Sequence, residues 1–287
     1  MNHKAIIFYL GLFIFPLSAL SFLNILYSTY FDYFLSIESY TITFFFTLLI
    51  GIFFYLYGKN SIKKISFYDQ LLLVLLVYLF SSFFISLPYY FSHYQITFID
   101  SIFESFSGIT STGFSIFENI KYLDPTLILW RSTSQWIGGL YFLIFIVIIF
   151  SYNQYNFKLN HLVYTGNMGS TSKLNIQNIL FQIFFVYSLS TLLVFVILNF
   201  GSVRLFNSLN LSMTIISNGG FLPTNSLNQI FLKENNYILA IVLLIPTLNI
   251  FLLYNFYNKK RIINNHQEDL FLIFFISILS LVMYYTL

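Results

Sequence analysis

The sequence predicts an all-α polytopic membrane protein, with about seven transmembrane helices and two shorter half-helices that enter the membrane without crossing it. Hydrophobic residues make up 58% of the 287 residues and charged residues only 8%, whereas about 25% of a soluble domain is charged. Apolar runs of about 18 or more residues, long enough to span a bilayer as a helix, recur along the chain. They are continuous rather than alternating, which excludes an outer-membrane barrel.

The first region, residues 1–66, contains two predicted spans at residues 5–28 and 40–57. The first span includes Pro16, which membrane helices tolerate when neighbouring groups satisfy the freed carbonyl. A cleaved signal peptide is the alternative. Its apolar core would be about 7–15 residues long and followed by small residues. The run here is longer and ends in bulky residues, so a retained helix is favoured.

Two later regions, residues 67–152 and 175–257, share one plan: a span, a short apolar segment, a glycine-bearing turn and a second span. The short segments lie at residues 98–109 and 206–216. Because neither is long enough to cross the bilayer, each fits a re-entrant half-helix. The four spans of these regions lie at residues 70–90, 125–152, 175–200 and 237–257. We interpret the two regions as two copies of one pore unit.

The remaining segments connect or follow these units. Residues 153–174 are polar and glycine-bearing, and they predict a cytoplasmic loop. Residues 258–287 begin with a basic loop and end in a lone apolar run that predicts a final transmembrane helix. Of the 13 Lys and Arg residues, nine fall on one side of the membrane in this topology. Basic loops face the cytoplasm, so the N-terminus is expected to be cytoplasmic.

The turns of the two pore units align at a constant offset of 107 residues, residues 107–114 with residues 214–221. Both turns end in Gly-Phe and are rich in small polar residues. Irregular polar backbone at membrane depth must line water or be buried in protein. We therefore interpret the turns as the filter loops of an ion pathway. The predicted filter residues are Thr110, Ser111, Thr112, Gly113, Phe114, Ser217, Asn218, Gly219, Gly220 and Phe221.

A selectivity filter replaces the water shell of an ion with backbone carbonyls. Gly113 and Gly220 suit the positive φ angles that such a backbone needs, and the hydroxyls of Thr110, Ser111 and Thr112 can add oxygen ligands. The negative C-terminal end of each half-helix would favour a cation. The alternative is that these are re-entrant or surface loops whose Ser, Thr and Gly content is accidental. Two such loops in equivalent positions favour the filter.

Two charged residues of the first unit are predicted to support its filter. Arg131 lies near the start of a membrane helix, where a charge usually has a partner or a function. Glu104 lies on the half-helix and is the predicted partner. The alternative is an interfacial arginine that extends to the lipid headgroups. The second unit has Leu211 and Ile238 at the same offset, so it lacks both members of this pair.

Other kinds of site find little support in the sequence. There are no cysteines, and the four histidines are far apart with no helical ligand spacing. No phosphate-binding loop for ATP hydrolysis is present. We therefore expect no enzyme activity, no cofactor, no nucleic-acid partner and no metal ion other than a monovalent cation at the filter.

The first filter region is similar to the first pore unit of the Trk/Ktr potassium transporter family. The resemblance rests on residues 103–114 (Phe-Glu-Ser-Phe-Ser-Gly-Ile-Thr-Ser-Thr-Gly-Phe), on Trp130-Arg131-Ser132 and on Gln135-Trp136-Ile137-Gly138-Gly139. The second unit, which ends in Gly220-Phe221, is a weaker match. The resemblance implies potassium uptake across the cytoplasmic membrane by a multi-pass subunit. It also implies a cytosolic nucleotide-binding regulatory subunit as a partner.

The chain departs from the family pattern in ways that bear on function. The family has four pore units in one chain, and this chain has about two. Asn218 stands in the second filter where a threonine is usual. A second copy or a separate chain could supply the missing units. The alternative is a truncated or accessory membrane protein that keeps the fold without transport.

Overall fold

The computed structural model describes residues 2–61, 65–150, 176–230 and 236–246, together with positions 271, 272, 274–276 and 278. Every regular element in these ranges is a helix, and none of the described residues forms a strand. Five of the helices are long and apolar enough to cross a membrane. The prediction of an all-α polytopic membrane fold is confirmed.

The long helices begin and end close to the predicted positions. Ser66 and Asp69 form a reciprocal capping box at the start of α3, which fixes where this helix begins. Pro16 lies inside the first helix without ending it, as expected for a membrane helix. The five spans are α1 (His3–Tyr30), α2 (Ile37–Gly58), α3 (Phe67–Tyr90), α5 (Pro125–Phe150) and α6 (Ile176–Phe200).

The two pore units repeat in three dimensions at the offset seen in the sequence. The half-helices are α4 (Phe98–Ile109) and α7 (Leu205–Ile216), each of 12 residues. Each half-helix is followed by a polar turn and then a short 3-10 helix, η1 (Ile120–Tyr122) or η3 (Leu227–Gln229). Helix α7 lies 107 residues after α4 in the sequence, and η3 lies 107 residues after η1. Thr97 caps α4 by accepting a hydrogen bond from the Asp100 N–H, which places the start of this half-helix.

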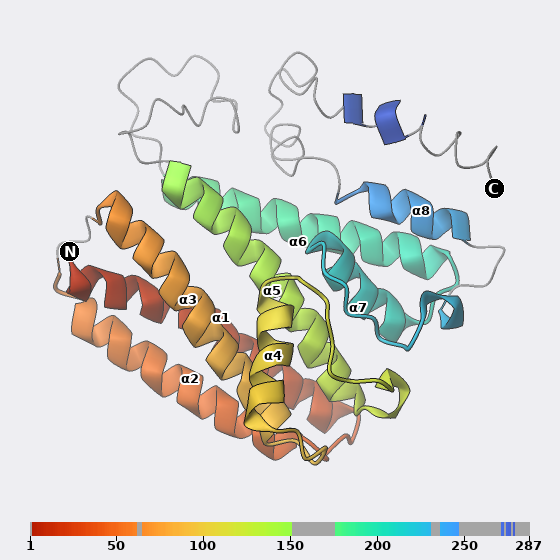
Figure 1. Cartoon of the computed structure of the whole chain (residues 1–287), viewed down its shortest axis with the longest axis horizontal. Coiled ribbons are helices and arrows are strands. Elements are labelled where there is room, and N and C mark those ends of the chain that lie inside the picture. Colours follow the sequence, from red (N-terminus) through yellow and green to blue (C-terminus); the bar gives the residue numbers. More distant parts are fainter. Residues whose placement is uncertain are drawn as a thin grey trace.

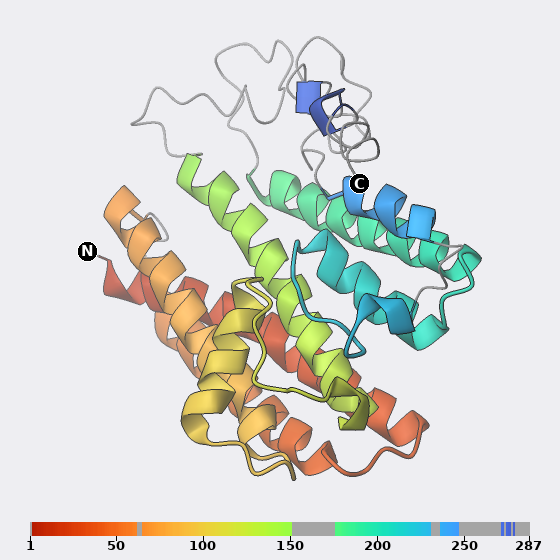
Figure 2. The ribbon, with the colours of Figure 1, turned by 45° about the vertical axis from the view of Figure 1, so that its right-hand side comes forward.

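Helix α5 runs through the middle of the molecule (Figure 1). Helices α1, α2, α3 and α4 lie on one side of it, and α6, α7 and the short helix α8 (Asn236–Leu244) lie on the other, as the rotated view also shows (Figure 2). Helix α5 contacts both half-helices. It therefore packs against both helices that lead into the predicted filter loops.

Three predictions fall wholly or partly outside the described residues. These are the cytoplasmic loop at 153–174, most of the sixth span at 237–257, and the basic loop and final helix at 258–287. Of these segments, the structure describes the start of the sixth span, as α8, and the helical positions 271, 272, 274–276 and 278 of the predicted final helix.

Candidate filter site

The two predicted filter loops share their backbone conformation where each leaves its half-helix. Ser111 and Asn218 both lie in the left-handed region, with φ angles of 53° and 52°. The N–H of Thr112 donates to the Ser107 carbonyl at 2.9 Å, and the N–H of Gly219 makes the equivalent bond to Thr214 at 2.7 Å. Asparagine tolerates the left-handed region better than threonine does. The departure at Asn218 thus suits the backbone of the second loop.

The loops touch each other through their glycines. A Cβ atom added to Gly113 would lie 2.5 Å from the Gly220 Cα, and one added to Gly220 would lie 3.1 Å from the Gly113 Cα. Gly113 has the expected positive φ, at 85°. The same expectation for Gly220 is wrong, because Gly113 is the only glycine with a positive φ in the described part of the chain. Gly220 is needed for close approach between the loops rather than for its φ angle.

The hydroxyl groups of the first loop differ in their surroundings. Thr110 and Thr112 are exposed, and their Oγ1 atoms lie 2.7 Å apart. The Thr110 hydroxyl also donates to the Phe106 carbonyl at 2.6 Å. The Ser111 hydroxyl is buried and has no hydrogen-bond partner among the described residues. Of the three hydroxyl groups in the first loop, only those of Thr110 and Thr112 therefore belong to exposed residues.

Glu104 and Arg131 form an ion pair with 2.8 Å between Arg131 Nε and Glu104 Oε1. The two side chains are 0% and 1% exposed. The alternative of an arginine that extends to the headgroups does not fit this burial. The second carboxylate oxygen of Glu104 accepts the Ile116 N–H at 2.9 Å, and the first accepts the Ser115 hydroxyl at 3.1 Å. Glu104 is thus tied to the segment that directly follows the first filter.

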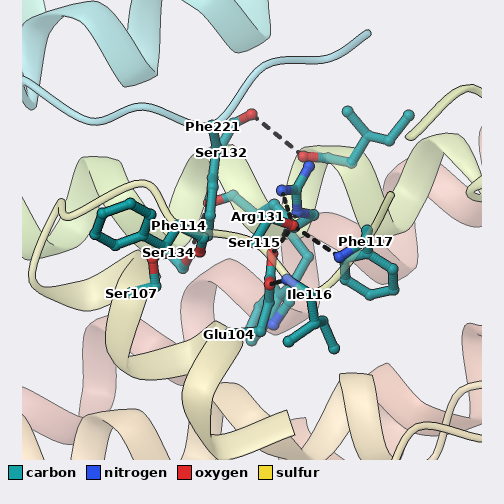
Figure 3. Close-up of polar contacts among 12 residues, drawn as sticks. Glu104, Ser107, Phe114, Ser115, Ile116, Phe117, Arg131, Ser132, Ser134 and Phe221 are labelled. Atoms are coloured by element: carbon teal, nitrogen blue, oxygen red, sulfur yellow. Dashed lines mark hydrogen bonds and ion pairs between the residues drawn. The ribbon is translucent and has the colours of Figure 1, made fainter. Parts of the chain in front are cut away.

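Arg131 also contacts the second filter (Figure 3). Its guanidinium carbon lies 4.2 Å from the centroid of the Phe221 ring, a cation–π distance. Its Nη1 donates to the Leu222 carbonyl at 3.4 Å, and its Nη2 donates to the Ser115 hydroxyl at 2.9 Å. One side chain from α5 therefore joins the segments that follow both filters.

Gln135, one turn further along α5, contacts the second filter directly. Its Oε1 accepts the N–H of Phe221 at 3.2 Å, and its side chain is fully buried. A Cβ atom on Gly219 would lie 2.2 Å from this Oε1, so only glycine leaves room for the contact. Gln135 belongs to a motif that carries the family resemblance, but no role was predicted for its side chain. The available signal was an amide in an apolar helix with Val242 at the repeat-equivalent position.

Gly138 and Gly139 allow α5 to approach both filter loops. A Cβ atom on Gly138 would lie 2.0 Å from the Ile109 carbonyl oxygen, and one on Gly139 would lie 2.9 Å from Ser217 Cβ. Ile109 and Ser217 stand at the junctions between each half-helix and its loop. The glycine pair is a close-packing point, and it packs against both pore units.

No family model matches the chain. An uncharacterized cation transporter of Methanocaldococcus jannaschii is 26% identical over 184 residues, which cover 62% of this chain and 38% of that protein. The potassium uptake protein TrkH of Escherichia coli is 28% identical over 171 residues, which cover 57% of this chain and 35% of that protein. Over part of its length, the chain is therefore similar in sequence to Trk potassium uptake proteins.

The fold is also that of a Trk protein. The crystal structure of the potassium transporter TrkH from Vibrio parahaemolyticus matches 88% of this chain with a TM-score of 0.72 and 23% sequence identity. The match covers 51% of the TrkH chain. This chain therefore spans about half the length of the Trk protein whose fold it shares.

Proposed function

We propose that this protein forms half of a channel-like pathway for potassium uptake across the cytoplasmic membrane, with filter loops at residues 110–114 and 217–221. The contact between Gly113 and Gly220 carries the proposal. Two loops with the same first turn lie side by side at the C-terminal ends of two half-helices, where partial negative charge favours a cation. The names of the Trk relatives favour potassium as that cation.

The ion would meet backbone carbonyls of both loops and the exposed hydroxyls of Thr110 and Thr112. The buried pair of Glu104 and Arg131 would keep the two loops in position through contacts with Ile116 and Phe221, and neither side chain would face the ion. A buried arginine that is fully paired can support a cation pathway, because the carboxylate cancels its charge. In this proposal neither residue is an ion ligand.

The topology and partners belong to the same proposal. The excess of Lys and Arg on one side favours a cytoplasmic N-terminus, which would open both filters toward the outside. The pore needs two more filters, from a second copy or a separate chain. A cytosolic nucleotide-binding subunit would act as regulator, a role that rests on the family resemblance alone.

The test is growth at low potassium of cells that lack their own potassium uptake systems. The chain is expressed alone and together with a polypeptide that carries the two missing pore units. We expect restored growth when all four units are present. Absence of growth in both settings, with the protein verified in the membrane, would favour an accessory or truncated protein without transport.

A further inference from the structure

A group of buried oxygen atoms without hydrogen-bond partners lies away from the filters, where α2 packs against the start of α5. Asp124 directly precedes α5, Thr126 lies in its first turn, and Tyr40 is on α2. These residues are 8%, 0% and 0% exposed. Within the described part of the chain, Asp124 Oδ2, Thr126 Oγ1 and the Tyr40 hydroxyl have no hydrogen-bond partner. Because buried polar groups in proteins nearly always have a partner, we looked for one outside the chain.

Packing brings the three side chains together. The centroid of the Tyr40 ring lies 5.8 Å from that of the Trp130 ring, which places α2 against the first turns of α5. The Tyr40 hydroxyl faces both the Thr126 hydroxyl and the Asp124 carboxylate. It is not within hydrogen-bond distance of either. Oxygen atoms that share one cation are arranged in this way, since each points at the ion and they repel one another.

Two serine hydroxyls extend this group along the loop between α1 and α2. Ser36 precedes α2, makes no capping hydrogen bond with its side chain, and lies one helical turn before Tyr40. Ser28 is close to the end of α1, and its neighbour Tyr27 interacts electrostatically with Asp124. Both serine hydroxyls are buried and without a partner among the described residues. We call Asp124, Thr126, Tyr40, Ser36 and Ser28 the oxygen cluster.

A helix cap accounts for only one of the two carboxylate oxygens of Asp124. Its Oδ1 accepts the Thr126 N–H at 3.2 Å, as expected of a residue that precedes a helix. Its Oδ2 has no donor, and no described Lys, Arg or His forms an ion pair with it. A buried carboxylate is costly unless it is paired or bound to a metal ion. The described part of the chain therefore leaves Asp124 without a positive partner.

An open acidic cavity lies next to the oxygen cluster. The Tyr94 hydroxyl accepts the Asp124 N–H at 2.5 Å, and Tyr94 also lines a cavity of about 590 Å³. The lining of this cavity includes Asp100 and Glu118. Two carboxylates in an open cavity raise the local concentration of cations. Cations are therefore attracted to the side of Tyr94 that faces away from Asp124.

We propose that the oxygen cluster binds one monovalent alkali cation, sodium or potassium, at a site separate from both filters. Oxygen ligands suit hard cations, and a single carboxylate matches a single positive charge. The described residues contain no group of three or more His, Cys, Asp or Glu that could hold a metal ion. No metal site outside the filters was expected, since Tyr40 and Asp124 are far apart in the sequence.

The bound cation joins the hairpin of α1 and α2 to the start of α5. Helix α5 in turn contacts both half-helices. The role of this ion is structural, and the inference does not depend on the proposed transport function. Its loss should loosen the attachment of the first two helices to the helix that supports the filters.

The test is the thermal unfolding midpoint of the purified full chain in detergent, at constant ionic strength, as N-methylglucamine is replaced by sodium or by potassium. A ligand that binds only the folded protein raises the midpoint. We expect a saturable rise with sodium or potassium, and the more effective ion is the one the site prefers. Asp124→Asn keeps an oxygen for the Thr126 N–H but should need at least about tenfold more cation for half of the rise.

Asp32→Asn is the matched control for the change in charge. Asp32 is exposed in the loop between α1 and α2, and its φ of 57° is also tolerated by asparagine. This variant loses one carboxylate near the same end of the molecule. It should respond to sodium and potassium as the native chain does.

Tyr40→Phe and Thr126→Val keep the test decisive if Asp124→Asn does not fold. Each variant removes one buried hydroxyl and nearly preserves the shape of the side chain. In N-methylglucamine alone they should be at least as stable as the native chain, because they remove an unsatisfied polar group. They should nevertheless need about tenfold more cation for half of the rise. If water alone fills the site, neither variant will change the response to cations.

Thr110→Ala separates this site from ions bound at the filters. It removes an exposed filter hydroxyl and should keep the part of the rise that Asp124→Asn loses. Loss of the whole rise in Thr110→Ala would assign the ion to the filter and overturn the inference. The inference is also wrong if N-methylglucamine stabilises as well as sodium and potassium, if only a divalent cation stabilises, or if the three cluster variants respond as the native chain does.

Discussion

The guanidinium carbon of Arg131 lies 4.2 Å from the centroid of the Phe221 ring, so a side chain of the first pore unit packs on the filter of the second. The same side chain forms a 2.8 Å ion pair with Glu104 on the first half-helix. Arg131 therefore links the two filters, and its loss should affect both.

Arg131→Gln is expected to destabilise the protein by about 3–5 kcal/mol, because it leaves the Glu104 carboxylate buried without its counter-charge. The double variant Glu104→Gln with Arg131→Gln should recover much of that loss, since no uncompensated charge remains. The measurement is the thermal unfolding midpoint of purified protein in detergent, with the amount in the membrane as a second readout. An unchanged midpoint in the single variant would show that the pair does not brace the filters.

Gly113→Ala is expected to abolish cation uptake. The added Cβ would meet the Gly220 Cα at 2.5 Å, and alanine is strained at a φ of 85°. Gly220→Ala has more room, with its nearest neighbour at 3.1 Å and no positive φ, so it should reduce uptake less. The two variants are compared by rubidium uptake into cells that express both halves of the pore, and Gly113→Ala should lose more uptake than Gly220→Ala. The opposite order of effects would contradict the observed contact between the loops.

Asn218→Thr is expected to destabilise the protein by about 1–2 kcal/mol, because the left-handed φ of 52° is costly for a β-branched residue. Asn218→Gly should be tolerated. The comparison tests whether asparagine at this position fits its backbone or marks a degraded filter. The thermal unfolding midpoints of the two variants distinguish these readings. A threonine variant as stable as the native protein would indicate that Asn218 marks a filter that has lost its function.

Much of this architecture follows from local sequence, and the links between units do not. The half-helix at 98–109 was predicted with the bounds that the structure shows, because its limits are set by a cap at Thr97 and a polar turn after Ile109. The contacts of Arg131 and Gln135 with Phe221 join residues about 90 positions apart, and no periodicity or spacing reports such a contact. The role of Gly220 was misassigned for the same reason, since a close approach between two loops leaves no local signal.

Gln135→Met is expected to lower the preference of the pathway for rubidium over sodium, because it keeps the side-chain length but removes the acceptor for the buried Phe221 N–H. An unsatisfied buried N–H costs about 1–3 kcal/mol, enough to shift the second loop. Gln135→Glu retains an acceptor oxygen and should keep more of the preference. The preference for rubidium over sodium is measured by competition between the two ions in uptake assays. Equal selectivity in both variants would show that Gln135 only fills space.

The most direct test of the central claim is rubidium flux into vesicles that contain this chain together with a polypeptide supplying the missing pore units. If residues 110–114 and 217–221 line one cation pathway, flux should require both polypeptides. It should disappear with Gly113→Ala while the assembled complex stays intact. Flux that survives Gly113→Ala, or no flux from an intact complex of the native chains, would contradict the account.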